Sequence, residues 1–128
     1  MFSLRGYHVD MSEMPLLPPE AIGSVCLAGE TQFAPNGIVS RTVFRTPQVR
    51  QVLFGFDTGQ ELTEHTSPHH ALIQVLSGTS EWTLGTQART VGAGELLHLP
   101  PHAPHAVRAT ERFSMLLTLV RVDAPGST

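Results

Sequence analysis

From Gly37 to Val122 the chain is a succession of short runs rich in valine, leucine, phenylalanine and threonine, separated by turn residues. The runs recur at a spacing of roughly 8 to 12 residues, which is typical of an all-β sandwich or barrel. No stretch carries the period of an amphipathic helix. We therefore predict about nine or ten strands and no helix. The expected strands are residues 38–45, 49–56, 62–66, 71–77, 81–84, 88–91, 95–99, 103–109 and 113–122.

Turn residues also predict how neighbouring strands connect. Thr46-Pro47-Gln48 joins the first two strands. Gly78-Thr79 joins the strands 71–77 and 81–84, which we expect to pair as a hairpin.

The domain organisation follows from length and from the proline content of the N-terminal part. With 128 residues the chain is long enough for one hydrophobic core and too short for two. Residues 1–36 contain four prolines and no sustained period, and predict an irregular arm, with a short strand near 24–28, packed on the barrel or on a partner. Residues 37–122 form the expected barrel, and residues 123–128 are expected to be a flexible tail.

Charge and composition exclude several classes of partner. Lys and Arg number 8 against 11 Asp and Glu, and no basic patch is present, so nucleic acid is not an expected partner. The apolar runs are far shorter than a membrane span requires. The single cysteine, Cys26, and the lack of a signal-like segment at the start favour a cytoplasmic location. A hydrophobic fraction of 41% with only 15% charged residues favours a homodimer.

Two separated groups of residues carry the functional signal. The first is Gly59, then His65 after five intervening residues, Ser67, and Gly78. The second is Gly94, then Pro100 after five residues, and His105. This paired pattern resembles the two motifs of the cupin family. The resemblance implies an all-β, RmlC-like jelly-roll β-barrel in a single domain, with both motifs lining one pocket for a small molecule.

The resemblance also implies a divalent metal, Zn, Fe, Ni, Mn or Cu, held by two histidines and a carboxylate of the first motif and one histidine of the second. This sequence keeps His65 and His105 at ligand positions. Ser67 stands at the second histidine position and Ala71 at the glutamate position, while His102 replaces a motif glycine and Ala109 replaces the final asparagine. Two imidazoles alone are a weak site, so the absence of a tightly held metal is an equal alternative.

The segment after Ser67 offers replacement ligands. Side chains alternate along a strand, and counting back from Val75, Ile73 and Ala71 places His69 on the inward face. A bulge at Pro68 would turn His70 inward instead. The candidate metal ligands are therefore His65, His69 and His105, with His70 as the alternative to His69. The predicted ligand pocket consists of His65, Ser67, His69, Ile73, Val75, His105 and Val107.

Three functions are compatible with this pocket. The first is a metal-dependent enzyme with oxygenase-type or isomerase-type chemistry on a small organic molecule. The second is a module that binds a small ligand without turnover and without a tightly bound metal. The third is metal-free acid/base catalysis by His65 or His105, which lacks an orienting carboxylate in clear register. Strand parity places Glu64, Gln74 and His98 on the outside.

Overall fold

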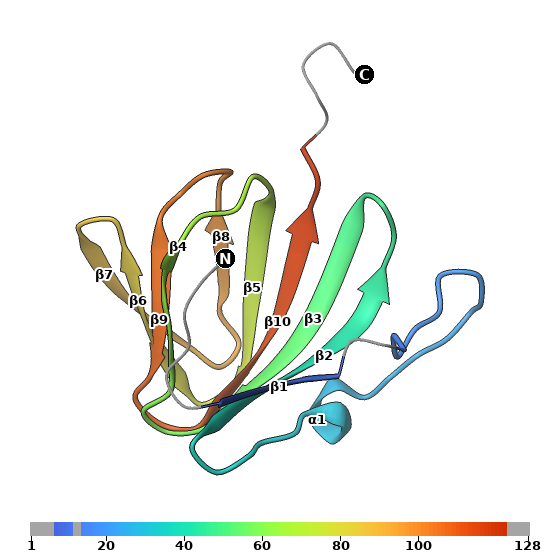
Figure 1. Cartoon of the computed structure of the whole chain (residues 1–128), viewed down its shortest axis with the longest axis horizontal. Coiled ribbons are helices and arrows are strands. Elements are labelled where there is room, and N and C mark those ends of the chain that lie inside the picture. The colour runs from blue at the N-terminus through green and yellow to red at the C-terminus, as the bar shows by residue number, and fades with distance from the viewer. Residues whose placement is uncertain (1–6, 12–13, 123–128) are drawn as a thin grey trace.

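The computed structural model describes residues 7–11 and 14–122, which form two β-sheets that face each other (Figure 1). The all-β prediction is confirmed. The strands are β1 (Tyr7–Met11), β2 (Gly37–Arg45), β3 (Val49–Phe56), β4 (Glu61–His65), β5 (His70–Ser77), β6 (Thr79–Leu84), β7 (Gln87–Gly92), β8 (Leu96–Leu99), β9 (His105–Ala109) and β10 (Phe113–Val120), and one short helix is α1 (Leu27–Glu30). No helix in the described part of the chain is both long and apolar enough to cross a membrane.

The larger sheet has the strand order β1-β2-β3-β10-β5-β8, and the smaller has the order β4-β9-β6-β7. All neighbours pair antiparallel except β1 and β2, which pair in parallel. Strands that are distant in sequence therefore lie side by side. In particular, β10 lies between β3 and β5, and β9 lies between β4 and β6.

The core lies between the two sheets and follows the alternation of side chains along each strand. On β5 Ala71, Ile73 and Val75 are buried, whereas Gln74 is exposed. Phe56 and Phe113, on the adjacent strands β3 and β10, are fully buried and stack with ring centroids 4.5 Å apart. Each sheet thus contributes one apolar face to a single core.

The arm covers the outer face of the six-stranded sheet. Leu16 and Leu17 pack against an outer apolar cluster around Val43, Leu53 and Leu116. The backbone N–H groups of Leu16 and Leu17 donate to the carbonyl oxygens of Thr42 and Val43, at 3.1 and 2.7 Å. Burial of apolar side chains and these backbone bonds together fix this part of the arm on the sheet.

Two predictions for the arm were wrong. The strand expected near 24–28 is absent, and the helix α1, which the sequence did not indicate, covers Leu27–Glu30. A helix of four residues is too short to show a hydrophobic period. The tail predicted at 123–128 lies outside the described residues.

The predicted hairpin between residues 71–77 and 81–84 was also wrong. β5 and β6 belong to different sheets, because the chain crosses from one to the other at Gly78. Gly78 has φ +73°, and a Cβ there would overlap the carbonyl oxygen of Arg112 and lie 2.8 Å from the Cβ of Phe113. The glycine therefore lets the crossing chain pass close to the start of β10.

This crossing gives the first testable prediction. Replacing Gly78 with alanine should destabilise the fold by about 3 kcal/mol, because backbone strain at positive φ adds to the steric overlap. Gly85→Ala is the matched control, since Gly85 has φ +65° but nothing within 4 Å of its Cβ position. We expect it to cost only about 1 kcal/mol. Urea unfolding of both variants measures the difference, and equal losses would contradict the close approach at Gly78.

Candidate functional site

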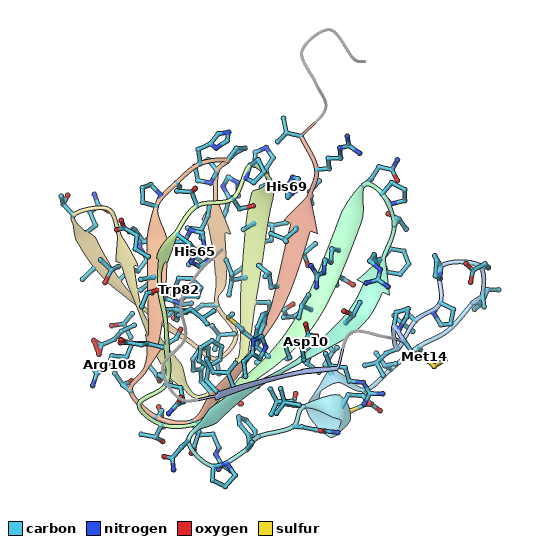
Figure 2. All side chains as sticks on the ribbon, viewed as in Figure 1. Asp10, Met14, His65, His69, Trp82 and Arg108 are labelled. Atoms are coloured by element: carbon cyan, nitrogen blue, oxygen red, sulfur yellow. The ribbon has the colours of Figure 1, made fainter. Side chains whose placement is uncertain are left out.

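A cavity opens between the two sheets, and its polar groups come from two histidines. His65 and His105 share it with side chains that are mainly apolar. About 50 Å³ is open to the centres of water molecules, whereas a single water needs roughly 10–15 Å³. Several waters or one small organic molecule therefore fit. Figure 2 shows His65 and Trp82 between the sheets. The other lining residues are Phe54, Leu62, Ile73, Trp82, Val107, Met115 and Leu117.

Strand pairing places the two histidines opposite each other. His65 is the last residue of β4 and His105 the first of β9, and they are direct partners in the antiparallel register. Their ring centroids lie 4.2 Å apart, with the planes inclined by 60°. His105 is buried and His65 half-buried. The structure therefore brings together the two histidines that occupy ligand positions in the sequence motifs.

Hydrogen bonds to the backbone set the tautomer of both rings. Nδ1 of His65 donates to the carbonyl oxygen of Thr63, and Nδ1 of His105 donates to that of Ala103, each at 2.9 Å. Since a carbonyl oxygen only accepts, Nδ1 carries the proton in both rings. In the neutral rings Nε2 then holds the lone pair. The pair is therefore built to accept hydrogen bonds through Nε2 or to ligate a metal there.

Burial lowers the pKa of His105 below its ordinary value. The hydrogen bond to Ala103 acts in the opposite direction, and a positive charge on His65 lowers the pKa further. The net shift favours the neutral ring at physiological pH. His105 therefore acts as an acceptor under those conditions.

Trp82 forms a wall of the cavity, although it belongs to neither sequence motif. Its Nε1 donates to Oγ of Ser80 at 2.9 Å, and that hydroxyl donates to the carbonyl oxygen of Val91 at 2.8 Å. The indole nitrogen is thus satisfied inside the protein, and the ring lies with its centroid 6.3 Å from that of His105. Alternation along β6, β3 and β10 is the sequence signal that could have found Trp82, Phe54, Met115 and Leu117.

The other predicted pocket residues are distributed between this cavity and its surroundings. Ile73 and Val107 line the cavity, and Val75 is buried in the adjacent core. Ser67 is not among the lining residues. Its Oγ accepts from the backbone N–H of His69 at 3.2 Å, and its carbonyl oxygen accepts from the N–H of His102 at 2.7 Å. Ser67 therefore organises the loop between β4 and β5.

The structure does not bring His69 or His70 to the histidine pair. His69 lines a separate hollow, formed by the β2–β3 turn and the end of β10. His70 is exposed, and its Nδ1 lies 3.0 Å from Nε2 of the exposed His98. Across residues 7–11 and 14–122, no three His, Cys, Asp or Glu side chains lie close enough together to hold a metal. Glu64 and Gln74 are exposed, as their parity predicts.

The donor set at the cavity differs from the one that the divalent metal implied by the sequence motifs requires. Two neutral imidazoles supply no negative charge, and the cavity's other lining residues are apolar. Tightly held divalent metals in proteins generally have at least three protein ligands, and histidine sites of oxygenases add a carboxylate. The residues present at the cavity therefore do not fit a tightly held metal.

Comparisons with known proteins identify the fold family. Residues 52–120, more than half of the chain, match the family model for the cupin domain. The chain belongs to the cupin family. No curated protein matches this cupin significantly.

Solved structures agree with this assignment. A conserved protein of unknown function from Streptococcus pyogenes is 32% identical, with 81% of this chain and 91% of that one covered and a TM-score of 0.74. A cupin 2 conserved barrel domain protein from Leptotrichia buccalis is 34% identical over 73% of this chain and 46% of that one, with a TM-score of 0.70. An RmlC-like cupin from Desulfovibrio desulfuricans is 28% identical over 78% of this chain and 97% of that one, with a TM-score of 0.71.

The second cupin motif keeps its backbone shape despite the residue that replaces its glycine. His102 has φ +68°, in the left-handed region where a motif glycine is unstrained. Its N–H bond to Ser67 ties this loop to the loop between β4 and β5. The loop that follows His65 and the loop that precedes His105 are thus joined directly.

The environment of His105 gives the second prediction. Because burial lowers its pKa in the folded state, the unfolded chain binds a proton first as the pH falls. The stability from this residue is present above about pH 6.5 and decreases as the pH falls through the folded pKa. We expect the NMR titration midpoint of His105 below 6.5, and a higher midpoint in His65→Ala, which removes the charge of His65 and admits water.

Unfolding measured between pH 7 and 5 checks the linkage. His105→Gln should lose stability less steeply than the wild type as the pH falls. His8→Gln should remove a separate part of the slope, because burial lowers the pKa of His8 as well. An unchanged slope in His105→Gln would contradict the assignment.

Proposed function

We propose that this cupin binds a small, mostly apolar organic molecule between its sheets, without turnover and without a tightly bound metal. The observation that carries the proposal is the facing pair His65 and His105, with Nε2 of each neutral ring as acceptor in an otherwise apolar cavity. Such a site, apolar with a few convergent polar groups, is the usual form of a small-molecule pocket. The homodimer and the cytoplasmic location stay predictions.

The lining dictates the chemistry of the ligand. Trp82, Phe54 and Ile73 favour an apolar or aromatic body through the burial of its surface. The two imidazoles favour a hydroxyl or N–H group on that body, because a neutral ring offers Nε2 as an acceptor. Benzyl alcohol combines these features in a molecule of suitable size and serves as the probe.

The third prediction uses the fluorescence of Trp82, the single tryptophan of the chain. Benzyl alcohol should change this fluorescence saturably in the wild type. Val107→Phe should abolish the change by filling the cavity, whereas Val122→Phe, at an exposed position, should retain it. His105→Leu should lower the preference for benzyl alcohol over toluene by about 3- to 10-fold, the value of one hydrogen bond. A response that survives Val107→Phe would contradict binding in the cavity.

The fourth prediction concerns metal content. Protein purified after growth with added Zn, Fe, Ni, Mn and Cu should contain well below one equivalent of any of them, because only two of the described residues that line the cavity can ligate a metal. Elemental analysis of the wild type and of His65→Ala and His69→Ala makes the measurement. One equivalent of metal in the wild type, lost in the variants, would overturn the metal-free proposal in favour of a metal-dependent enzyme.

A further inference from the structure

We infer that the ligand carries an oxyanion, a carboxylate or a phosphate, which Arg50 and Arg121 bind in a hollow next to the cavity, lined also by His69. This inference rests on the proposed function and adds the charge of the ligand to it.

The hollow lies where three strands of the larger sheet begin or end. Arg50 is near the start of β3, Arg121 follows the end of β10, and His69 precedes β5. Figure 2 shows His69 at this end of the sheet, beyond His65 and Trp82. About 140 Å³ is open to the centres of water molecules, and Val49 and Leu119 are apolar residues of its lining. A carboxylate or phosphate group fits such a volume easily.

The charges that line the hollow are all positive. Its lining includes two arginines and no aspartate or glutamate. Elsewhere arginines pair with carboxylates, as Arg41 does with Glu30, Arg108 with Glu81 and Arg112 with Asp57. Within the described ranges 7–11 and 14–122, neither Arg50 nor Arg121 forms such an ion pair. A guanidinium binds carboxylate and phosphate through two parallel hydrogen bonds, so this pair suits an oxyanion.

His69 lines the same hollow, and one of its ring nitrogens has no hydrogen-bond partner among the described residues. This atom, Nδ1, is buried. Because this nitrogen is closed to solvent, a molecule in the hollow does not reach it. His69 contributes its ring to the lining of the hollow, beside the two arginines.

The hollow continues the inward-facing face that lines the histidine cavity. Leu117 lines the cavity and Leu119 lines the hollow, two residues further along β10. In the sheet register Leu119 lies opposite Arg50 on one side and Ala71 on the other. Two residues along a strand span about 7 Å. A single molecule the size of an aromatic acid therefore reaches from the apolar cavity to the arginines.

Binding of three matched probes tests the inference. Benzoate, benzamide and phenyl phosphate share an aromatic ring, but benzamide is neutral. We expect benzoate or phenyl phosphate to bind at least about tenfold tighter than benzamide, the effect of one charge-assisted hydrogen-bond pair. The advantage should decrease with added salt. Fluorescence of Trp82 gives the affinities, and NMR shifts of the Arg50 and Arg121 amides give the location.

Three variants test which arginines bind the charged group of the ligand. Arg50→Gln and Arg121→Gln should each lower the anion's advantage over benzamide, and Arg89→Gln, at an exposed position on β7 of the other sheet, should preserve it. Whichever of benzoate and phenyl phosphate binds more tightly with this arginine dependence identifies the oxyanion.

The outcomes separate this inference from the proposed function. Equal binding of benzoate, phenyl phosphate and benzamide, or an advantage that persists in both arginine variants, would overturn the oxyanion site while benzyl alcohol still reports on the cavity. Failure of benzyl alcohol together with all three probes would overturn the proposed function and, with it, the ligand to which the oxyanion belongs.

Discussion

The structure depends on the alternation of side chains along β3, β10 and β5, three strands that are paired although they are distant in the sequence. One face of these strands supplies the core, through Phe56, Phe113 and Val75. The same face lines the cavity through Leu117 and Ile73, and ends in the hollow at Arg50 and His69. The inward-facing side chains of these strands are therefore apolar at the cavity and cationic at the hollow. This difference gives the site its direction.

Much of this arrangement could be predicted from the sequence because it is local. Strand alternation placed Gln74 and His98 outward, and the resemblance to the two cupin motifs implied that His65 and His105 share one pocket. His69, which was expected in that pocket, lines a separate hollow. The pairing of β10 with both β3 and β5 is not local, so the grouping of Arg50 with Arg121 and His69 could not be read from the chain. The change of sheet at Gly78 was not predicted either, because a glycine between two strands is equally compatible with a hairpin and with a change of sheet.

The replacements at Ser67 and Ala71 change what the cupin pocket offers. Ala71 is buried in the apolar core, where a glutamate would have to be desolvated and then paired with a cation. Ser67 uses its polar atoms within the loop that joins His65 to β5. Neither position supplies an anion to balance a divalent metal. The protein instead places positive groups, Arg50 and Arg121, in the neighbouring hollow. The balance of charge therefore favours an anionic ligand over a bound cation.

The cavity also favours the neutral form of His105. Burial, together with the charge of His65, lowers the pKa of His105. Its Nε2 therefore keeps its lone pair near neutral pH. A molecule that donates a hydrogen bond at one end and carries negative charge at the other matches both ends of the site. If the molecule bound in the reverse orientation, its anionic group would face the Nε2 acceptor, and the guanidinium groups of Arg50 and Arg121 would lack a counter-charge. The site therefore selects one direction of binding.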